Sequence, residues 1–186
     1  MALALADNLL GRDDLDEQGL LRRFVEWRDE GTYSCTGRCF DIGTTTNRAL
    51  SQWKKTGNLF ADSVDPHSAG NGSLMRLAPV AIRFWQDRPK LRDVAARQSK
   101  TTHAAPEAVD ASVAFAEMLA DAIEGRPISD VLRVRSDDYA GRISEIMKGS
   151  WRGKQRQAIR ASGYVAHTLE AASGALAELA TIVPLC

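Results

Sequence analysis

The sequence predicts an all-α protein, for three reasons. Apolar residues recur at helical spacing along most of the 186 residues, and runs that alternate apolar and polar residues are missing. Prolines stand where the first turn of a helix would begin, and glycines stand where helices would end. The expected helices span residues 1–10, 16–29, 44–57, 90–100, 106–124, 138–148 and 162–180, with a short or kinked element near Pro79.

The first third of the chain carries signals for three helices. Four leucines within the first ten residues indicate a helix that has no N-cap residue before it. An apolar stripe that includes Phe24 and Trp27 indicates the second helix, which Gly31 can end. The hydroxyl side chains of Thr44–Thr46 can cap the third helix, and we expect it to close near Gly57.

Proline and glycine define the later elements. Pro79 interrupts the helix that follows a glycine-rich segment, so this element is expected to be short or kinked. Pro89 and Pro106 suit the first turns of the next two helices, and Gly125 with Pro127 ends the second of these. The last two expected helices follow near 138–148 and 162–180.

Composition limits the classes of protein to consider. With 44% hydrophobic and 26% charged residues, residues 1–186 are expected to form one globular domain. Lys plus Arg and Asp plus Glu both number 24 without a long basic run, so no nucleic-acid binding surface is evident. No apolar stretch is long enough to span a bilayer. Three cysteines, Cys35, Cys39 and Cys186, favour a reducing cytoplasm over a disulfide framework.

The segment "SAGNGSLMR", residues 68–76, places two glycines around an asparagine. Glycines leave no side chain to keep a ligand away from the backbone N–H groups. If residues 73–77 are helical, the first N–H groups of that helix are unpaired and would favour a phosphate. An ordinary turn that opens a helix explains the same letters. Spacing leaves both interpretations open.

Few other residues stand out as chemical candidates. Asp41 lies between apolar residues before a glycine turn, so it is either a functional acid or the cap of the helix at Thr44–Thr46. His67 directly precedes the glycine-rich segment, and His103 lies just before the helix that starts at Pro106. Each is either a site residue or a structural hydrogen-bonding partner. The pairs Asp13–Asp14 and Asp137–Asp138 could supply metal ligands, but adjacent aspartates in polar loops are usually solvated.

Five ordered segments together resemble the ADP-ribosylglycohydrolase family, including its dinitrogenase-reductase-activating members. They are "MALALADNLL", "YSCTGRCFDIGTTTNRAL", "SAGNGSLMRLAPVAI", "THAAPEAVDA" and "ASGYVAHTLEAA". The resemblance implies a compact, all-α, orthogonal multi-helix domain that hydrolyses the glycosidic bond of ADP-ribose. It implies two divalent ions, Mg²⁺ or Mn²⁺, and an ADP-ribosylated protein or small ADP-ribose derivative as partner.

The resemblance also implies site residues. Asp41 matches a catalytic or ribose-orienting acid of the family. The residues expected along the ADP-ribose are Ser68, Gly70, Asn71, Gly72, Met75, Arg76 and His103. On this interpretation the glycines let the backbone close on a diphosphate and a ribose.

The sequence departs from the family pattern at both ends. The family's metal sites use a Thr-Asp-Asp-Thr element before the first matching helix and an Asp-x-Asp element near the C-terminus, and the sequence contains neither. We therefore expect a partial domain, truncated at both ends, with impaired activity and with apolar faces on residues 1–10 and 162–180 that favour self-association. A non-catalytic ADP-ribose-binding module and a crystallin-like structural relative remain as alternatives.

Overall fold

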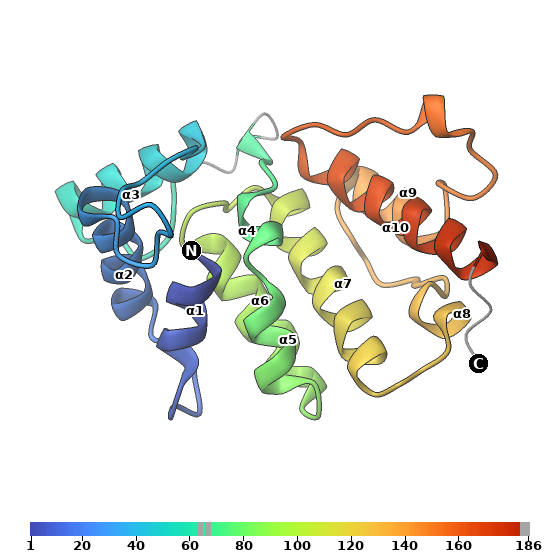
Figure 1. Cartoon of the computed structure of the whole chain (residues 1–186), viewed down its shortest axis with the longest axis horizontal. Helices are drawn as coiled ribbons and strands as arrows, with labels where there is room; N and C mark the ends of the chain where they lie inside the picture. The colour runs from blue at the N-terminus through green and yellow to red at the C-terminus, as the bar shows by residue number, and fades with distance from the viewer. Residues whose placement is uncertain (63–64, 66–67, 183–186) are drawn as a thin grey trace.

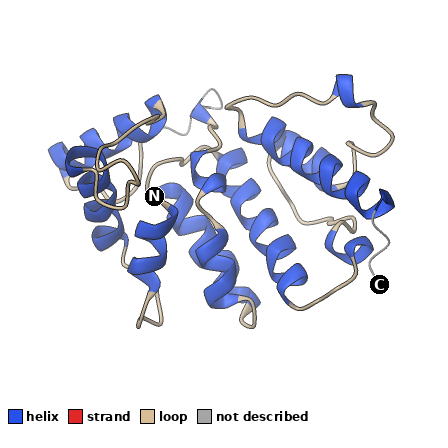
Figure 2. Ribbon diagram, viewed as in Figure 1, coloured by secondary structure: helices blue, strands red, loops and turns tan. Residues whose placement is uncertain are grey.

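The computed structural model describes residues 1–62, 65 and 68–182, and within this part of the chain it contains helices and loops but no strand (Figures 1 and 2). The all-α prediction is confirmed. The helices are α1 (Ala2–Leu9), α2 (Glu17–Glu30), α3 (Thr44–Thr56), α4 (Gly72–Met75), α5 (Ala78–Phe84), α6 (Arg88–Lys100), α7 (Pro106–Ile123), α8 (Ile128–Val131), α9 (Gly141–Met147) and α10 (Val165–Ile182), with a 3₁₀ turn at Arg156–Ala158.

The helix ends follow the predicted signals in most places. The carboxylate of Asp16 accepts a hydrogen bond from the Gly19 N–H at 2.9 Å and caps α2, which ends at Gly31 in the left-handed conformation. Gly57 ends α3 in the same way, and Pro106 is the first residue of α7. The short helix α8 was not predicted, because a four-residue helix carries no periodic pattern of its own.

The predicted cap of α3 is wrong. Gly43 is the N-cap residue, Thr44–Thr46 form the first helical turn, and no side chain caps the helix. A side chain caps a helix from the N-cap position, where its oxygen reaches the N–H groups of the second and third helical residues. The three threonines lie after that position, so their hydroxyl groups cannot cap. The start of α3 is therefore an open helix N-terminus.

Helix α7 forms the centre of the molecule (Figure 1). It contacts α4, α5 and α6 as well as α8, α9 and α10. Its buried residues are mostly alanines and valines spread around the helix, so neighbouring helices can approach it closely on several sides. The packing of α7 positions the segment just before it, which contains His103, at the pocket described below.

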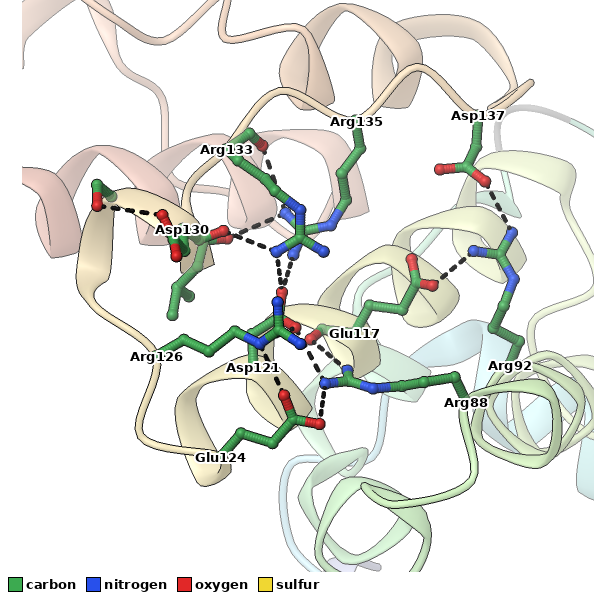
Figure 3. A network of polar contacts seen from close by, with 12 residues as sticks. Arg88, Arg92, Glu117, Asp121, Glu124, Arg126, Asp130, Arg133, Arg135 and Asp137 are labelled. Carbon is green, nitrogen blue, oxygen red and sulfur yellow. Dashed lines mark hydrogen bonds and ion pairs between the residues drawn. The ribbon is translucent and has the colours of Figure 1, made fainter.

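A network of arginines and acids anchors the far end of α7 (Figure 3). The carboxylate of Asp121 is 1% exposed and accepts hydrogen bonds from Arg88 at 3.0 Å, from Arg135 at 2.6 Å and from Arg133. Arg126 is 3.6 Å from the same carboxylate. The network connects the loop after α7 to the start of α6, so we assign these charged residues a structural role.

Three of the four paired aspartates, Asp13, Asp14 and Asp137, form ion pairs. Asp14 lies 2.8 Å from both Lys90 and Arg97, and these partners lower its pKa to about 2. Asp137 lies 3.4 Å from Arg92.

Some apolar side chains remain exposed, as the sequence led us to expect. Leu3 is 65% exposed on α1 and Leu179 is 57% exposed on α10, whereas Leu5 and Leu9 are buried. Self-association through these faces stays a prediction. No helix within the described ranges is long and apolar enough to cross a membrane.

Candidate functional site

A pocket of about 830 Å³ lies where α1, the loop before α3, the glycine-rich segment and the segment between α6 and α7 meet. Seven of the eight predicted site residues line it. They are Asp41, Gly70, Asn71, Gly72, Met75, Arg76 and His103. These residues are spread over more than sixty positions of the sequence, so the fold gathers them into one place.

The glycine-rich segment is held by hydrogen bonds to the residues just before α10 and to the first turn of that helix. The Asn71 N–H donates to the carbonyl oxygen of Gly163 at 2.9 Å, and the Asn71 side chain donates to the Thr168 hydroxyl at 2.9 Å. Gly70 and Tyr164 form an isolated antiparallel bridge. Asn71 therefore has a structural role that the sequence did not indicate.

The two glycines make room for an imidazole ring. A Cβ atom added at Gly72 would lie 2.8 Å from His103 Cε1, and one added at Gly70 would lie 3.2 Å from His103 Cδ2. The N–H groups of Gly70 and Asn71 already donate to carbonyl oxygens of the protein. Two N–H groups of the predicted diphosphate cradle are therefore already hydrogen-bonded within the protein, and the lack of side chains at Gly70 and Gly72 leaves room for the His103 ring.

His103 is a buried and neutral side chain at the pocket wall. It is 3% exposed, and its Nδ1 atom lies 2.8 Å from the Thr102 hydroxyl oxygen. Burial, together with the positive charge of Arg76, lowers the pKa of His103 to about 3. The ring is therefore uncharged at neutral pH.

Arg76 is a buried cation without a carboxylate partner among the described residues. It is 2% exposed, and its guanidinium donates to the side chain and backbone oxygens of Gln98 and to the Thr101 hydroxyl. Its Nη1 atom is buried and has no hydrogen-bond partner within the described ranges. Burial lowers the pKa of Arg76 to about 9, which still leaves it charged at neutral pH. An uncompensated buried charge is costly, so an anion at the pocket would relieve it.

The open N-terminus of α3 faces the same pocket. Thr44, Thr45 and Thr46 all line it, and no hydrogen bond within the described part of the chain uses their N–H groups. The thirteen-residue helix places its positive dipole end there. Free N–H groups and a positive potential at one helix end favour an anion. Sequence reasoning missed this feature, although Gly43, which has no side chain that could cap a helix, directly precedes the three threonines.

Asp41 is exposed and lines the pocket beside this helix end. Its φ is +52°, and Tyr33 across the same loop has φ +66°. Positive φ is uncommon for residues with a Cβ and is often found at functional sites. The capping role left open for Asp41 is excluded, because no side chain caps α3.

The remaining predicted residues have different positions. Ser68 lines a smaller neighbouring pocket of about 250 Å³ and donates its hydroxyl proton to the Asp65 carbonyl at 2.6 Å. Met75 is 73% exposed at the rim of the larger pocket. His67 and Cys186 lie outside the described residues.

Aromatic side chains that sequence reasoning missed form another wall of the larger pocket. Trp27, Tyr33 and Phe40 line it, and Phe40 is 56% exposed. A wall of this kind can hold a flat apolar ring, such as a nucleobase.

The acid content of the pocket does not suit a two-metal centre. Asp41 is the sole carboxylate among the described residues that line it, and no group of three or more His, Cys, Asp or Glu side chains in the described ranges could hold a metal ion. Two divalent ions need a dense set of oxygen ligands. The described residues therefore do not fit that group.

Comparison with known proteins identifies relatives of this chain. A family model described as ADP-ribosylglycohydrolase matches residues 1–181. The chain is 38% identical to an ADP-ribosylarginine hydrolase Tri1 of Pseudomonas putida, over 92% of this chain and 46% of the relative. It is 28% identical to an ADP-ribosyl-[dinitrogen reductase] glycohydrolase of Rhodospirillum rubrum, over 68% and 40% of the two chains.

A solved structure agrees with these sequence matches. It is described as an ADP-ribosylglycohydrolase-related protein complex and superposes with a TM-score of 0.77 at 32% identity, over 95% of this chain and 56% of the other. The chain spans about half the length of the curated relatives it matches first.

Proposed function

This chain belongs to the ADP-ribosylglycohydrolase family, and we propose that its larger pocket binds the ADP-ribosyl group of a modified protein or of a small ADP-ribose derivative. The observation that carries the proposal is that one pocket is lined both by a buried guanidinium with no carboxylate partner among the described residues and by an open helix N-terminus. We also propose that the whole protein hydrolyses the bond between the ribose and its acceptor, in the cytoplasm.

The electrostatics of the pocket support a diphosphate as the central recognised group. The N–H groups of Thr44–Thr46 and the cation of Arg76 both favour negative charge, and no described carboxylate forms a hydrogen bond or ion pair with either of them, although Asp41 lines the same pocket. A diphosphate offers acceptor oxygens in several directions, so it can satisfy both. The aromatic wall at Tyr33 and Phe40 suits the adenine at one end of the same ligand.

Asp41 is the residue assigned to the ribose end. Its carboxylate is exposed to the pocket and lies two residues before the N-cap of α3, close in sequence to the anion-binding N–H groups. Hydrolysis breaks the bond between the anomeric carbon and the acceptor atom, adds a water oxygen to that carbon and returns a proton to the acceptor. A carboxylate beside the ribose can orient its hydroxyl groups or accept a proton from the water.

Divalent ions are a general requirement of the family, but the described residues supply too few ligands for them. We therefore assign no step to a metal. The 186-residue chain by itself is expected to bind ADP-ribose without releasing it from a modified protein. This expectation keeps the non-catalytic binding module as the second candidate for the chain alone.

Calorimetry on the 186-residue chain tests the binding proposal. ADP-ribose should bind, inorganic pyrophosphate should compete with it, and adenosine should bind much more weakly because it lacks the anion. The matched variants are Asp41→Asn in the pocket and Asp13→Asn, whose carboxylate is fully exposed and lies outside the pocket residues. Pyrophosphate that fails to compete with bound ADP-ribose would contradict the assigned anion site.

An assay of ADP-ribose release from an ADP-ribosylarginine-containing protein, with millimolar Mg²⁺ or Mn²⁺, separates the enzyme from the binding module. No release above the protein-free control is expected. Release that a chelator abolishes, and that Asp41→Asn but not Asp13→Asn removes, would show that the chain builds a working centre from residues that we judged insufficient.

A further inference from the structure

Only one of the two ring nitrogens of His103 has a protein partner within the described residues. The Nδ1 atom lies 2.8 Å from the Thr102 hydroxyl oxygen. The Nε2 atom lies on the side of Gly70 and Gly72, about 3.2 Å and 3.1 Å from where their Cβ atoms would be, and no acceptor or donor in the described part of the chain reaches it. His103 lines the pocket, so a ligand atom can be the partner of Nε2.

The acceptor of the Thr102 hydroxyl proton determines which ring nitrogen of His103 carries hydrogen. Thr102 is 1% exposed, and its hydroxyl has no hydrogen bond to any other described residue. If Nδ1–H donated to the hydroxyl oxygen, the Thr102 O–H would be left buried without an acceptor among the residues that the structure describes. That arrangement costs about 1–3 kcal/mol. The favoured arrangement has the Thr102 O–H donating to Nδ1, so the ring proton sits on Nε2.

We infer that Thr102 is a positioning residue that fixes His103 as its Nε2–H tautomer, and that this imidazole donates a hydrogen bond to a phosphate or ribose oxygen in the pocket rather than acting as a general base. The inference rests on the proposed function for its ligand. An Nε2 atom that already carries hydrogen cannot take a proton from water.

The surroundings of the ring keep it in this state. Burial and the neighbouring Arg76 cation hold the pKa of His103 at about 3, so the ring stays neutral at pH 7. The charged group that faces it is Arg76, and the Gly70–Gly72 backbone together with Thr102 bounds the ring. A neutral donor of fixed orientation needs no reorganisation when a ligand oxygen arrives.

Nitrogen-15 NMR of the histidine ring tests the tautomer in the ligand-free 186-residue chain. The wild-type spectrum at pH 7 should show a protonated Nε2 and an unprotonated Nδ1 for His103. Thr102→Ser should keep this pattern because it keeps the hydroxyl, whereas Thr102→Val should shift the ring to a mixture of tautomers. Ser112→Ala removes a buried hydroxyl that contacts Ser73 rather than His103, and it should leave the pattern unchanged.

Calorimetry with ADP-ribose supplies the second readout. Thr102→Val should weaken binding about tenfold, which corresponds to one hydrogen bond of roughly 1.4 kcal/mol, while Thr102→Ser should stay close to wild type. A wild-type ring protonated on Nδ1 overturns the inference, even if Thr102→Val fails to fold. A tautomer unchanged in folded Thr102→Val overturns the role of Thr102. Failure of wild type to bind ADP-ribose, with the Nε2–H tautomer present, instead defeats the proposed function and its ligand while leaving the role of Thr102 standing.

Discussion

Gly72→Ala should destabilise the protein through a contact with one side chain. The added Cβ would lie 2.8 Å from His103 Cε1 and 3.1 Å from Nε2, whereas ordinary contacts begin at 3.4 Å. The ring cannot move away easily, because Thr102 holds Nδ1 and the side chain is 3% exposed. Forcing a methyl group into a packed site typically costs about 1–3 kcal/mol. Alanine returns about 0.5–1 kcal/mol of backbone entropy.

The net expectation for Gly72→Ala is a loss of about 1–2 kcal/mol in the free energy of unfolding. For a chain of this size that lowers Tm by roughly 2–8 °C. Gly70→Ala should cost less, since its Cβ would meet the ring at 3.2 Å. Gly163→Ala is the matched control, because nothing lies within 4 Å of its Cβ position.

Urea unfolding followed by circular dichroism at 222 nm measures the three variants on the same scale. The predicted order of destabilisation is Gly72→Ala, then Gly70→Ala, then Gly163→Ala, with the last close to wild type. Equal stability of Gly72→Ala and Gly163→Ala would refute the packing of His103 against the glycine-rich segment.

Three other outcomes follow from the same structure. Asp121→Asn should cost about 3 kcal/mol or more in unfolding free energy, because it leaves four arginines around a buried site without their carboxylate, and a loss no larger than that of Asp13→Asn would contradict this. The free energy of unfolding of the wild type should fall as the pH drops from 6.5 towards 3, and His103 should contribute up to about 1.4 kcal/mol per pH unit to this fall. Over this range the histidine binds a proton in the unfolded chain, whereas the native ring, with a pKa of about 3, does not. His103→Gln should have a shallower slope over this range, and an unchanged slope would place the proton uptake elsewhere. Asp41→Asn should leave the unfolding midpoint unchanged, since the side chain is exposed and asparagine tolerates the positive φ, and a clear loss of stability would indicate a structural role for Asp41.

Local chemistry explains why most helices were predictable. Asp16, Gly31, Gly57 and Pro106 act on the residues next to them, and each stands where the sequence indicated a helix start or end. The short helix α8 and the unused N-terminus of α3 were missed for the opposite reason. Whether a short helix forms, or a helix end stays uncapped, depends on tertiary packing and on side chains that the neighbouring sequence does not contain.

The site was predictable by residue type and much less by role. Resemblance indicated seven residues that the fold gathers around one pocket. It did not indicate that Gly70 and Gly72 make space for His103, that Asn71 bonds to Thr168, or that Arg76 is buried without a carboxylate. These roles depend on contacts between residues up to 97 positions apart, which no local pattern reveals.

Amide chemical-shift mapping with ADP-ribose tests the central claim most directly. The assigned ¹H–¹⁵N spectrum of the 186-residue chain would be followed during a titration with ADP-ribose. We predict that the largest shifts fall on the N–H groups of Thr44–Thr46, with further shifts at Asp41, Gly72 and His103, and that residues of the Asp121 network do not move. Shifts centred outside the larger pocket, or none at millimolar ADP-ribose, would contradict the claim that this pocket recognises the diphosphate of ADP-ribose.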